Sequence, residues 1–155
     1  MGKPVVNGSL IECDKSTMCP PNTPVPSFVP GAAMPIQVTP INRVNAGGVP
    51  IANEIDALPG SNIPMFFACQ SMTNPTVVAA CATAAASTMG AMQKAAAQCL
   101  FTPMPPGKWT TGCKKCKIGG QAVLDESGEL KCMMGGTIKI KKNLFTGANG
   151  QVECS

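Results

Sequence analysis

The sequence predicts a small, mainly β protein with one alanine-rich helix. The 155 residues include 16 glycines and 15 prolines, which favour tight turns and short strands over long regular elements. Only 13% of the residues are charged whereas 45% are apolar, so we expect an ordered, loop-rich body and not a disordered chain. The length suits a single domain over residues 1–155, and we place its core at about residues 8–142.

The first part of the chain, residues 1–64, is interrupted by proline every few positions. Proline lacks a backbone donor and breaks helices, so no long helix fits there. The apolar pieces between the prolines, such as PIQVTPI (35–41), predict short strands or extended segments.

One helix is predicted over about residues 75–99. Asn74 is a favourable N-cap, Pro75 suits the first helical position, and alanine, which dominates the stretch, has the highest helix propensity. Gly90 is expected to kink or split the helix, and Pro103 lies beyond its end. Polar residues, among them Lys94, interrupt the apolar stretch 76–101, which favours a water-exposed helix over a membrane span.

The last third of the chain predicts a strand and a recurring turn. In TIKIKK (137–142) the alternation places Ile138 and Ile140 on one face and the lysines toward solvent. A Gly-Gly pair followed by an extended apolar piece occurs at AGGVPI (46–51), IGGQAV (118–123) and MGGTIKI (134–140). The pairs suggest a repeated device in which two glycines turn the chain into a short strand.

The absence of histidine excludes several kinds of enzyme. Ser-His-Asp and Cys-His nucleophile systems and histidine-based zinc catalysis all need that residue. The eight carboxylates form no evident catalytic pair. We therefore expect a protein that is not an enzyme.

The nine cysteines are the residues with the clearest chemical potential. The spacing Cys113-x2-Cys116-x15-Cys132 matches three quarters of a zinc ribbon, but the second Cys-x2-Cys pair is missing. A distant fourth thiolate would have to complete such a site. CKKC (113–116) could instead be a thiol redox pair. Cys81 and Cys99, on the predicted helix, are expected to be buried apolar residues.

A series of short motifs occurs in order along residues 8–140. They are GSLIEC (8–13), NRV (42–44), GGVPIANEIDALPGSNIPMF (47–66), CQSMTNPTVVAA (69–80), LFTPMP (100–105), Trp109 with Gly112, IGGQAVLD (118–125) and CMMGGTIKI (132–140). Together they resemble the PAAR-like proteins that tip the spike of contractile injection systems, such as type VI secretion machines and extracellular injection particles. Stretches 14–27 and 87–99 are longer than the family pattern requires.

The resemblance implies a small conical tip with short strands and Gly/Pro turns. Such a tip caps and sharpens a trimeric β-helical spike, aids puncture of a target membrane that it contacts only transiently, and can carry effectors. We therefore expect a non-enzymatic structural protein whose partner is the trimeric spike and not nucleic acid. It would be made in the bacterial cytoplasm without a signal peptide, assembled at the particle tip and exported on firing.

Family tips often hold a metal ion, mainly through histidines, so a cysteine-held ion is expected here. Cys13, Cys69 and Cys132 fall on family cysteine positions, and a further family cysteine is replaced by Pro106. We take Cys116 as the fourth ligand, with Cys113, Cys19 and Cys154 as alternatives. Zinc is the expected ion, and iron is the alternative.

Two other functions fit parts of the sequence. Eight of the twelve basic residues lie between Lys108 and Lys142, so a zinc-ribbon-like nucleic-acid-binding protein is the main alternative. A thiol redox enzyme using Cys113 and Cys116 is the other.

Overall fold

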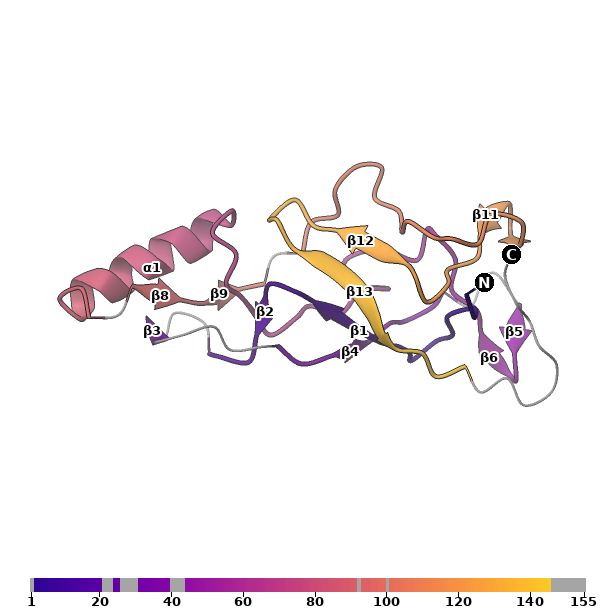
Figure 1. Ribbon diagram of the computed structural model, residues 1–155, viewed down its shortest axis with the longest axis horizontal. Coiled ribbons are helices and arrows are strands. Elements are labelled where there is room, and N and C mark those ends of the chain that lie inside the picture. The colour runs from indigo at the N-terminus through magenta and orange to yellow at the C-terminus, as the bar shows by residue number, and fades with distance from the viewer. Residues whose placement is uncertain are drawn as a thin grey trace.

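The computed structural model describes residues 2–20, 24–25, 31–39, 44–91, 93–99 and 101–145. It is mainly β with one helix, which confirms the predicted fold class. The strands belong to small antiparallel sheets, and most of them are two residues long (Figure 1). The elements in chain order are β1 (Leu10–Cys13), β2 (Ser16–Thr17), β3 (Pro24–Val25), β4 (Met34–Pro35), β5 (Asn45–Ala46), β6 (Val49–Pro50), β7 (Ala68–Cys69), α1 (Pro75–Ser87), β8 (Lys94–Ala95), β9 (Ala97–Gln98), β10 (Lys117–Ile118), β11 (Gln121–Ala122), β12 (Glu129–Lys131) and β13 (Thr137–Lys142).

The largest sheet has the order β12-β13-β1-β4 and forms the middle of the molecule. Its longest strand, β13, is the predicted TIKIKK strand. Ile138 is fully buried, Ile140 packs against the core, and Lys139, Lys141 and Lys142 are exposed, as the alternation predicted. In the pairing of β1 with β13, Cys13 lies opposite Ile138.

Two of the three Gly-Gly pairs form the same kind of turn. Gly47-Gly48 connects β5 to β6 and Gly119-Gly120 connects β10 to β11, and all four glycines have positive φ angles near 60° or 80°. Two consecutive positive φ angles match the tight hairpin turn that suits the right-handed twist of paired strands. These two pairs confirm the predicted device.

The third pair, Gly135-Gly136, differs. It lies in a longer turn between β12 and β13, at the end of the central sheet remote from the two hairpins (Figure 1). The third pair therefore does not form the hairpin turn that the other two share.

Helix α1 begins as predicted but ends earlier than expected. The Asn74 Oδ1 atom accepts a hydrogen bond from the Thr76 N–H at 3.0 Å, and Pro75 opens the helix. The predicted extent of about 75–99 is wrong, because α1 stops at Ser87 and the chain turns through positive φ angles at Met89 and Gly90. The residues after the turn pair as strands instead: β8 with β3, and β9 with β7. Strand pairing with distant segments outweighs the helix propensity of alanine there.

Within the described residues, no helix combines the length and apolar character needed to cross a bilayer.

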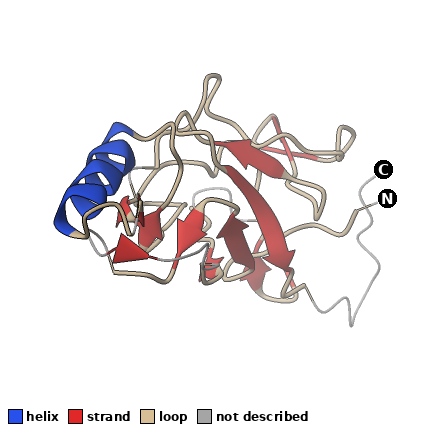
Figure 2. Cartoon of the chain, turned by 60° about the vertical axis from the view of Figure 1, so that its left-hand side comes forward, coloured by secondary structure: helices blue, strands red, loops and turns tan. Residues whose placement is uncertain are grey.

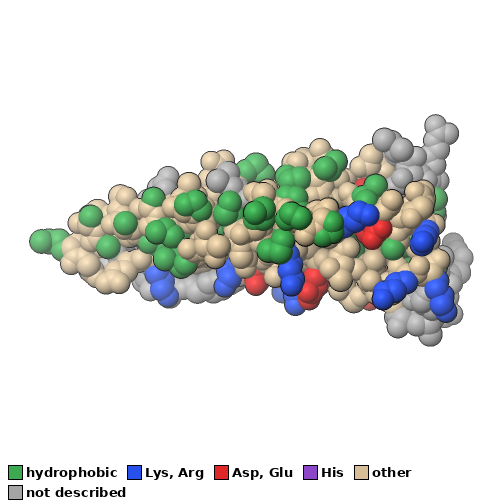
Figure 3. Space-filling model, turned by 90° about the horizontal axis from the view of Figure 1, so that it is seen from above, with side chains coloured by type: hydrophobic (Ala, Val, Ile, Leu, Met, Phe, Trp, Pro, Cys, Tyr) green, Lys and Arg blue, Asp and Glu red, His purple; other side chains and the backbone are tan. Residues whose placement is uncertain are grey.

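The molecule is elongated and narrows toward one end (Figures 1 and 3). The narrow end consists of α1 and the returning strand β8, with β3 beside them, and the broad end carries the hairpins β5-β6 and β10-β11. Between α1 and the central sheet lies a three-stranded sheet with the order β2-β7-β9 (Figure 2). Stretches 14–27 and 87–99, which the sequence singled out as additional, thus meet through the β3–β8 pair at the narrow end.

The core is a thin line of aliphatic and small residues, in which Ile11, Ile36, Ile63, Leu124 and Leu130 are almost fully buried. Outside the sheets, buried polar side chains stabilise the loops through hydrogen bonds. The Asn62 side chain donates to the Gln37 carbonyl at 2.8 Å and to the Asp56 carboxylate at 3.3 Å, and it accepts from the Leu58 N–H at 3.2 Å. The Asp56 carbonyl in turn accepts from the Trp109 indole at 2.9 Å.

We expect the substitution Asn62→Ala to lower the free energy of unfolding by about 1–3 kcal/mol, because it removes the hydrogen bonds that the buried Asn62 side chain makes to the Gln37 carbonyl and the Leu58 N–H. Chemical denaturation under reducing conditions measures this loss. Asn45→Ala, at an exposed position of β5, is the matched control and should change stability by less than about 0.5 kcal/mol. Equal effects of the two substitutions would contradict the clamping role of Asn62.

Candidate functional site

Four cysteines from four separate segments gather where the central sheet meets the narrow end. Cys13 ends β1, Cys69 lies in β7, Cys99 follows β9, and Cys132 follows β12. Antiparallel pairing places Cys69 opposite Ala97, two residues before Cys99. The Cys132 N–H bonds the Gly136 carbonyl at 2.8 Å, and a Cβ atom added at Gly136 would lie 2.8 Å from the Cys13 sulfur.

Two of these sulfurs, those of Cys69 and Cys132, accept a hydrogen bond from the backbone N–H two residues further along the chain. The Ser71 N–H donates to Cys69 Sγ and the Met134 N–H to Cys132 Sγ, both at 3.4 Å. Backbone hydrogen bonding lowers the pKa of Cys13 through Lys15, and that of Cys99 through Phe66 and then Phe101. The loops that follow Cys69 and Cys132 therefore adopt the same local turn around their sulfur.

Burial sets the protonation of the cluster. Desolvation raises the pKa of the Cys13 thiol to about 12 and that of the Cys99 thiol to about 11, although the backbone N–H donors oppose the shift. Negative charge on Cys69 would raise both pKa values further, and the pKa of Cys99 also responds to charge on Cys132. The four sulfurs are thus electrostatic neighbours, and the raised pKa values keep Cys13 and Cys99 as neutral thiols at neutral pH.

Among the described residues, no three Cys, Asp or Glu side chains already meet in a group that could hold a metal ion. The four thiols are close enough to feel one another's charge, but their sulfurs do not surround a common point. The donor set nevertheless suits a soft divalent cation, since thiolates are the ligands that zinc and iron prefer in proteins.

The structure brings together three of the four predicted ligands and places the fourth elsewhere. Cys13, Cys69 and Cys132 belong to the main core with Cys99, whereas Cys116 packs with Cys113 in a second apolar cluster at the broad end. Sequence reasoning missed Cys99, which it took for an apolar helix residue. Because Cys99 reaches the cluster only through the pairing of β9 with β7, no local motif could have indicated it.

The other cysteines lie apart from this cluster. Cys81 is buried beneath α1, where its sulfur accepts from the Ala95 N–H at 3.3 Å, and Cys19 lies partly exposed after β2. Cys154, an alternative ligand in the sequence analysis, falls outside the described residues.

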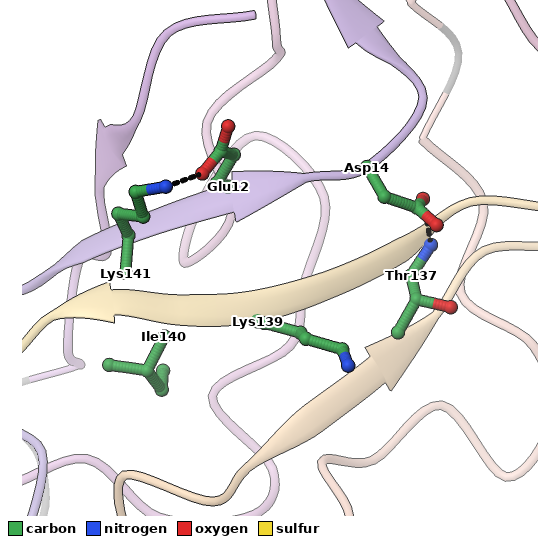
Figure 4. A pocket seen from close by; sticks show the side chains of 6 residues that line it. All are labelled: Glu12, Asp14, Thr137, Lys139, Ile140 and Lys141. Atoms are coloured by element: carbon green, nitrogen blue, oxygen red, sulfur yellow. Dashed lines mark hydrogen bonds and ion pairs between the residues drawn. The ribbon is translucent and has the colours of Figure 1, made fainter. Parts of the chain in front are cut away.

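A shallow hollow of about 340 Å³ lies over β1 and β13, near Cys13 (Figure 4). Its polar groups are mostly engaged: Lys141 pairs with Glu12 at 2.9 Å, and the Asp14 carboxylate accepts from the Thr137 N–H at 2.8 Å. The remaining lysine, Lys139, points toward β12 and bonds Glu129 at 2.9 Å, which raises its pKa. The hollow therefore has the character of a solvated sheet face.

The two ends of the molecule differ in charge. At the broad end, Lys3, Lys114, Lys115 and Lys117 are exposed, and none makes an ion pair within the described part of the chain. Figure 3 shows blue side chains gathered around this end. By contrast, residues 57–93, which include α1 and the turn after it, contain no charged residue. Met89, in that turn, is 97% exposed.

Fold and site together define a tapered, mainly β unit with a thiol cluster where the central sheet meets the narrow end, and with exposed lysines at the broad end. The chain belongs to a family described as a domain of unknown function (DUF4280), whose model matches residues 5–144. Searches of curated proteins and of solved structures found no match.

We expect Gly136→Ala to destabilise the protein by about 1–3 kcal/mol, because the new methyl group would press on the Cys13 sulfur in a tightly packed turn. Thermal and urea unfolding under reducing conditions measure the loss. Met133→Ala changes a half-exposed side chain of the same turn and should cost clearly less. A Gly136→Ala protein as stable as wild type would show that the cluster is more loosely packed than described.

Proposed function

We propose that this protein is a non-enzymatic, PAAR-like tip that caps the trimeric β-helical spike of a contractile injection machine. The observation that carries the proposal is the combination of taper and charge: a narrow end in which Lys94 is the single charged residue of α1, β3 and β8, opposite a broad end with four exposed, unpaired lysines. The resemblance of the motifs over residues 8–140 to such tips supports the same assignment.

The broad end suits attachment to the end of a spike. Hairpins β5-β6 and β10-β11 are each two strands wide. The Pro50 carbonyl of β6 and the Ala122 carbonyl of β11 are bonded to the Asn7 and Glu54 N–H groups, so β5 and β10 are the strands with a free edge for pairing. Val44 and Val49, beside the first hairpin, expose apolar surface. The unpaired lysines would favour a spike end that carries carboxylates, since complementary charge speeds and orients docking.

A single chain on a threefold spike end requires an asymmetric contact. The two hairpins differ in sequence and in their neighbours, so one copy would engage the three spike chains in three different ways. We therefore expect one tip per spike trimer. A second copy would overlap the first near the axis.

The narrow end suits passage through a bilayer. Each charged side chain placed at the centre of a membrane costs at least about 2.5–3.5 kcal/mol; α1 and the turn after it contribute none, and β8 contributes only Lys94. The exposed face of α1 carries threonine, valine and alanine, small uncharged side chains that cost little free energy to place in either water or lipid. We expect the contact with the membrane to be transient and driven by contraction of the sheath.

Mixing the tip with the purified spike trimer of the same particle tests capping. We expect a complex of one tip and three spike chains by light scattering. Replacing Lys114 and Lys115 together by glutamate should weaken it about tenfold or more at low salt, because repulsion replaces attraction. Lys131→Glu reverses an exposed charge on the central sheet and should leave the complex unchanged.

The proposal fails if no capping complex forms with the cognate spike, or if three tips bind per trimer. Tight, steeply salt-dependent binding to DNA or RNA with no binding to the spike would instead favour the nucleic-acid-binding alternative.

A further inference from the structure

We propose that Cys113 and Cys116 of the CKKC loop (113–116) are a reversible dithiol–disulfide pair, and that the disulfide fixes the two lysines between them, Lys114 and Lys115, for docking. The formation of the disulfide stands on the structure alone. Its effect on docking rests on the proposed function, which places these two lysines at the end of the spike.

The two cysteines belong to one short loop that folds back on itself. The Cys113 sulfur lies 4.0 Å from the Cys116 carbonyl oxygen, so the first thiol is packed against the backbone of the second cysteine. Both side chains also pack in the same apolar cluster at the broad end, with Ile51 and Ile118 among their neighbours. The loop thus holds the two thiols close together in the reduced protein.

Hydrogen bonds anchor the backbone at both ends of this loop. The Cys113 N–H donates to Thr111 Oγ1 at 3.3 Å, and the Cys116 carbonyl accepts from the Val123 N–H at 3.0 Å. A disulfide forms without strain only when the backbone positions of its two cysteines are already close. Here the anchors limit how far the two positions can move apart.

The two thiols differ in exposure, as a stepwise exchange with a small disulfide requires. Cys116 is half-buried and can be reached from solvent, whereas Cys113 is fully buried. The Cys116 thiolate would attack one sulfur of glutathione disulfide, form a mixed disulfide and release one glutathione. The Cys113 thiolate would then attack the Cys116 sulfur, close the protein disulfide and release the second glutathione. The two protein thiols lose two electrons and two protons, and the two glutathione molecules take them up.

Among the described cysteines, Cys113 and Cys116 are the pair that combines one buried and one accessible thiol within a single loop. The four cysteines of the main cluster come from four separate segments. Cys81 is buried beneath α1, where its sulfur is bonded to both backbone polar groups of Ala95. The CKKC loop is therefore the place where a small disulfide meets the least obstruction.

The disulfide would restrict a loop that carries exposed charge. Lys114 and Lys115 make no ion pair within the described part of the chain. Ordering such a loop on binding costs free energy, and a loop that is already fixed in the free protein avoids that cost. The disulfide also lowers the entropy of the unfolded chain, although the small size of the closed ring limits the gain. We therefore expect oxidation to raise both the melting temperature and the affinity for the spike.

Redox titration of the whole chain tests the pairing. The reduced protein is equilibrated with mixtures of glutathione and glutathione disulfide, free thiols are alkylated, and each cysteine is assigned by mass spectrometry. We expect Cys113 and Cys116 to be oxidised together, before any other cysteine, in a disulfide that dithiothreitol reverses. Cys113→Ser should instead trap glutathione on Cys116, because the resolving thiol is missing. Cys81→Ser changes a buried cysteine elsewhere, and this matched control should form the Cys113–Cys116 disulfide as the wild type does.

The wild-type protein alone supplies a second measurement, which does not depend on the folding of a variant. The oxidised form should melt a few degrees above the reduced form. It should also bind the purified spike trimer about threefold more tightly at low salt. Cys116→Ser, which cannot close the disulfide, should bind the spike equally well under oxidising and reducing conditions.

Three outcomes would overturn the inference. They are a Cys113–Cys116 pair that stays reduced while other cysteines oxidise, a disulfide that joins Cys116 to a distant cysteine, and equal spike affinity of the reduced and oxidised proteins. Absence of a capping complex in both redox forms would contradict the proposed function and, with it, the effect on docking. The alkylation measurement would still decide whether the disulfide forms.

Discussion

The structure depends on ties between distant segments, because its own strands are too short to hold it. A two-residue strand contributes few ladder hydrogen bonds, and an isolated two-stranded hairpin is only marginally stable in water. In the part of the chain that the structure describes, three of the five sheets have only two strands. Stability must therefore come from the central sheet, from buried side chains such as Asn62 that bond several backbone groups at once, and from the junction where the four cysteines meet.

The tapered shape explains this dependence. A body that narrows has little interior at its thin end, so large aliphatic side chains give way there to alanine and cysteine. Each alanine buries little apolar area, and burial contributes only about 25 cal/mol per Å². A small unit with so limited a core needs a further constraint, and nature commonly supplies it through a disulfide or a metal.

The sequence predicted the features that local chemistry determines. The start of α1 follows from Asn74 and Pro75, the strand face follows from the alternation of Ile138 and Ile140, and the hairpin turns follow from Gly47-Gly48 and Gly119-Gly120. The end of the helix could not be predicted in the same way. Residues 94–98 have helical composition, and only their pairing with β3 and β7 makes them strands. The grouping of Cys99 with Cys69 follows from that same pairing, so the error on the helix and the omission from the site have one cause.

The pairing of β9 with β7 also explains how a long narrow end is attached to the rest of the molecule. The chain leaves the junction at Cys69, runs out along α1, turns at Met89 and Gly90, and returns to the junction at Cys99. A thiol therefore stands at each end of the projection. Strand β7 at the start of the projection pairs with β9 at its end and with β2, which directly follows β1, so that force applied at the turn would pass into the central sheet. The projection can then be long without a wider core, because the segment that extends it, from α1 to β9, is also the segment that pairs with β7 at its base.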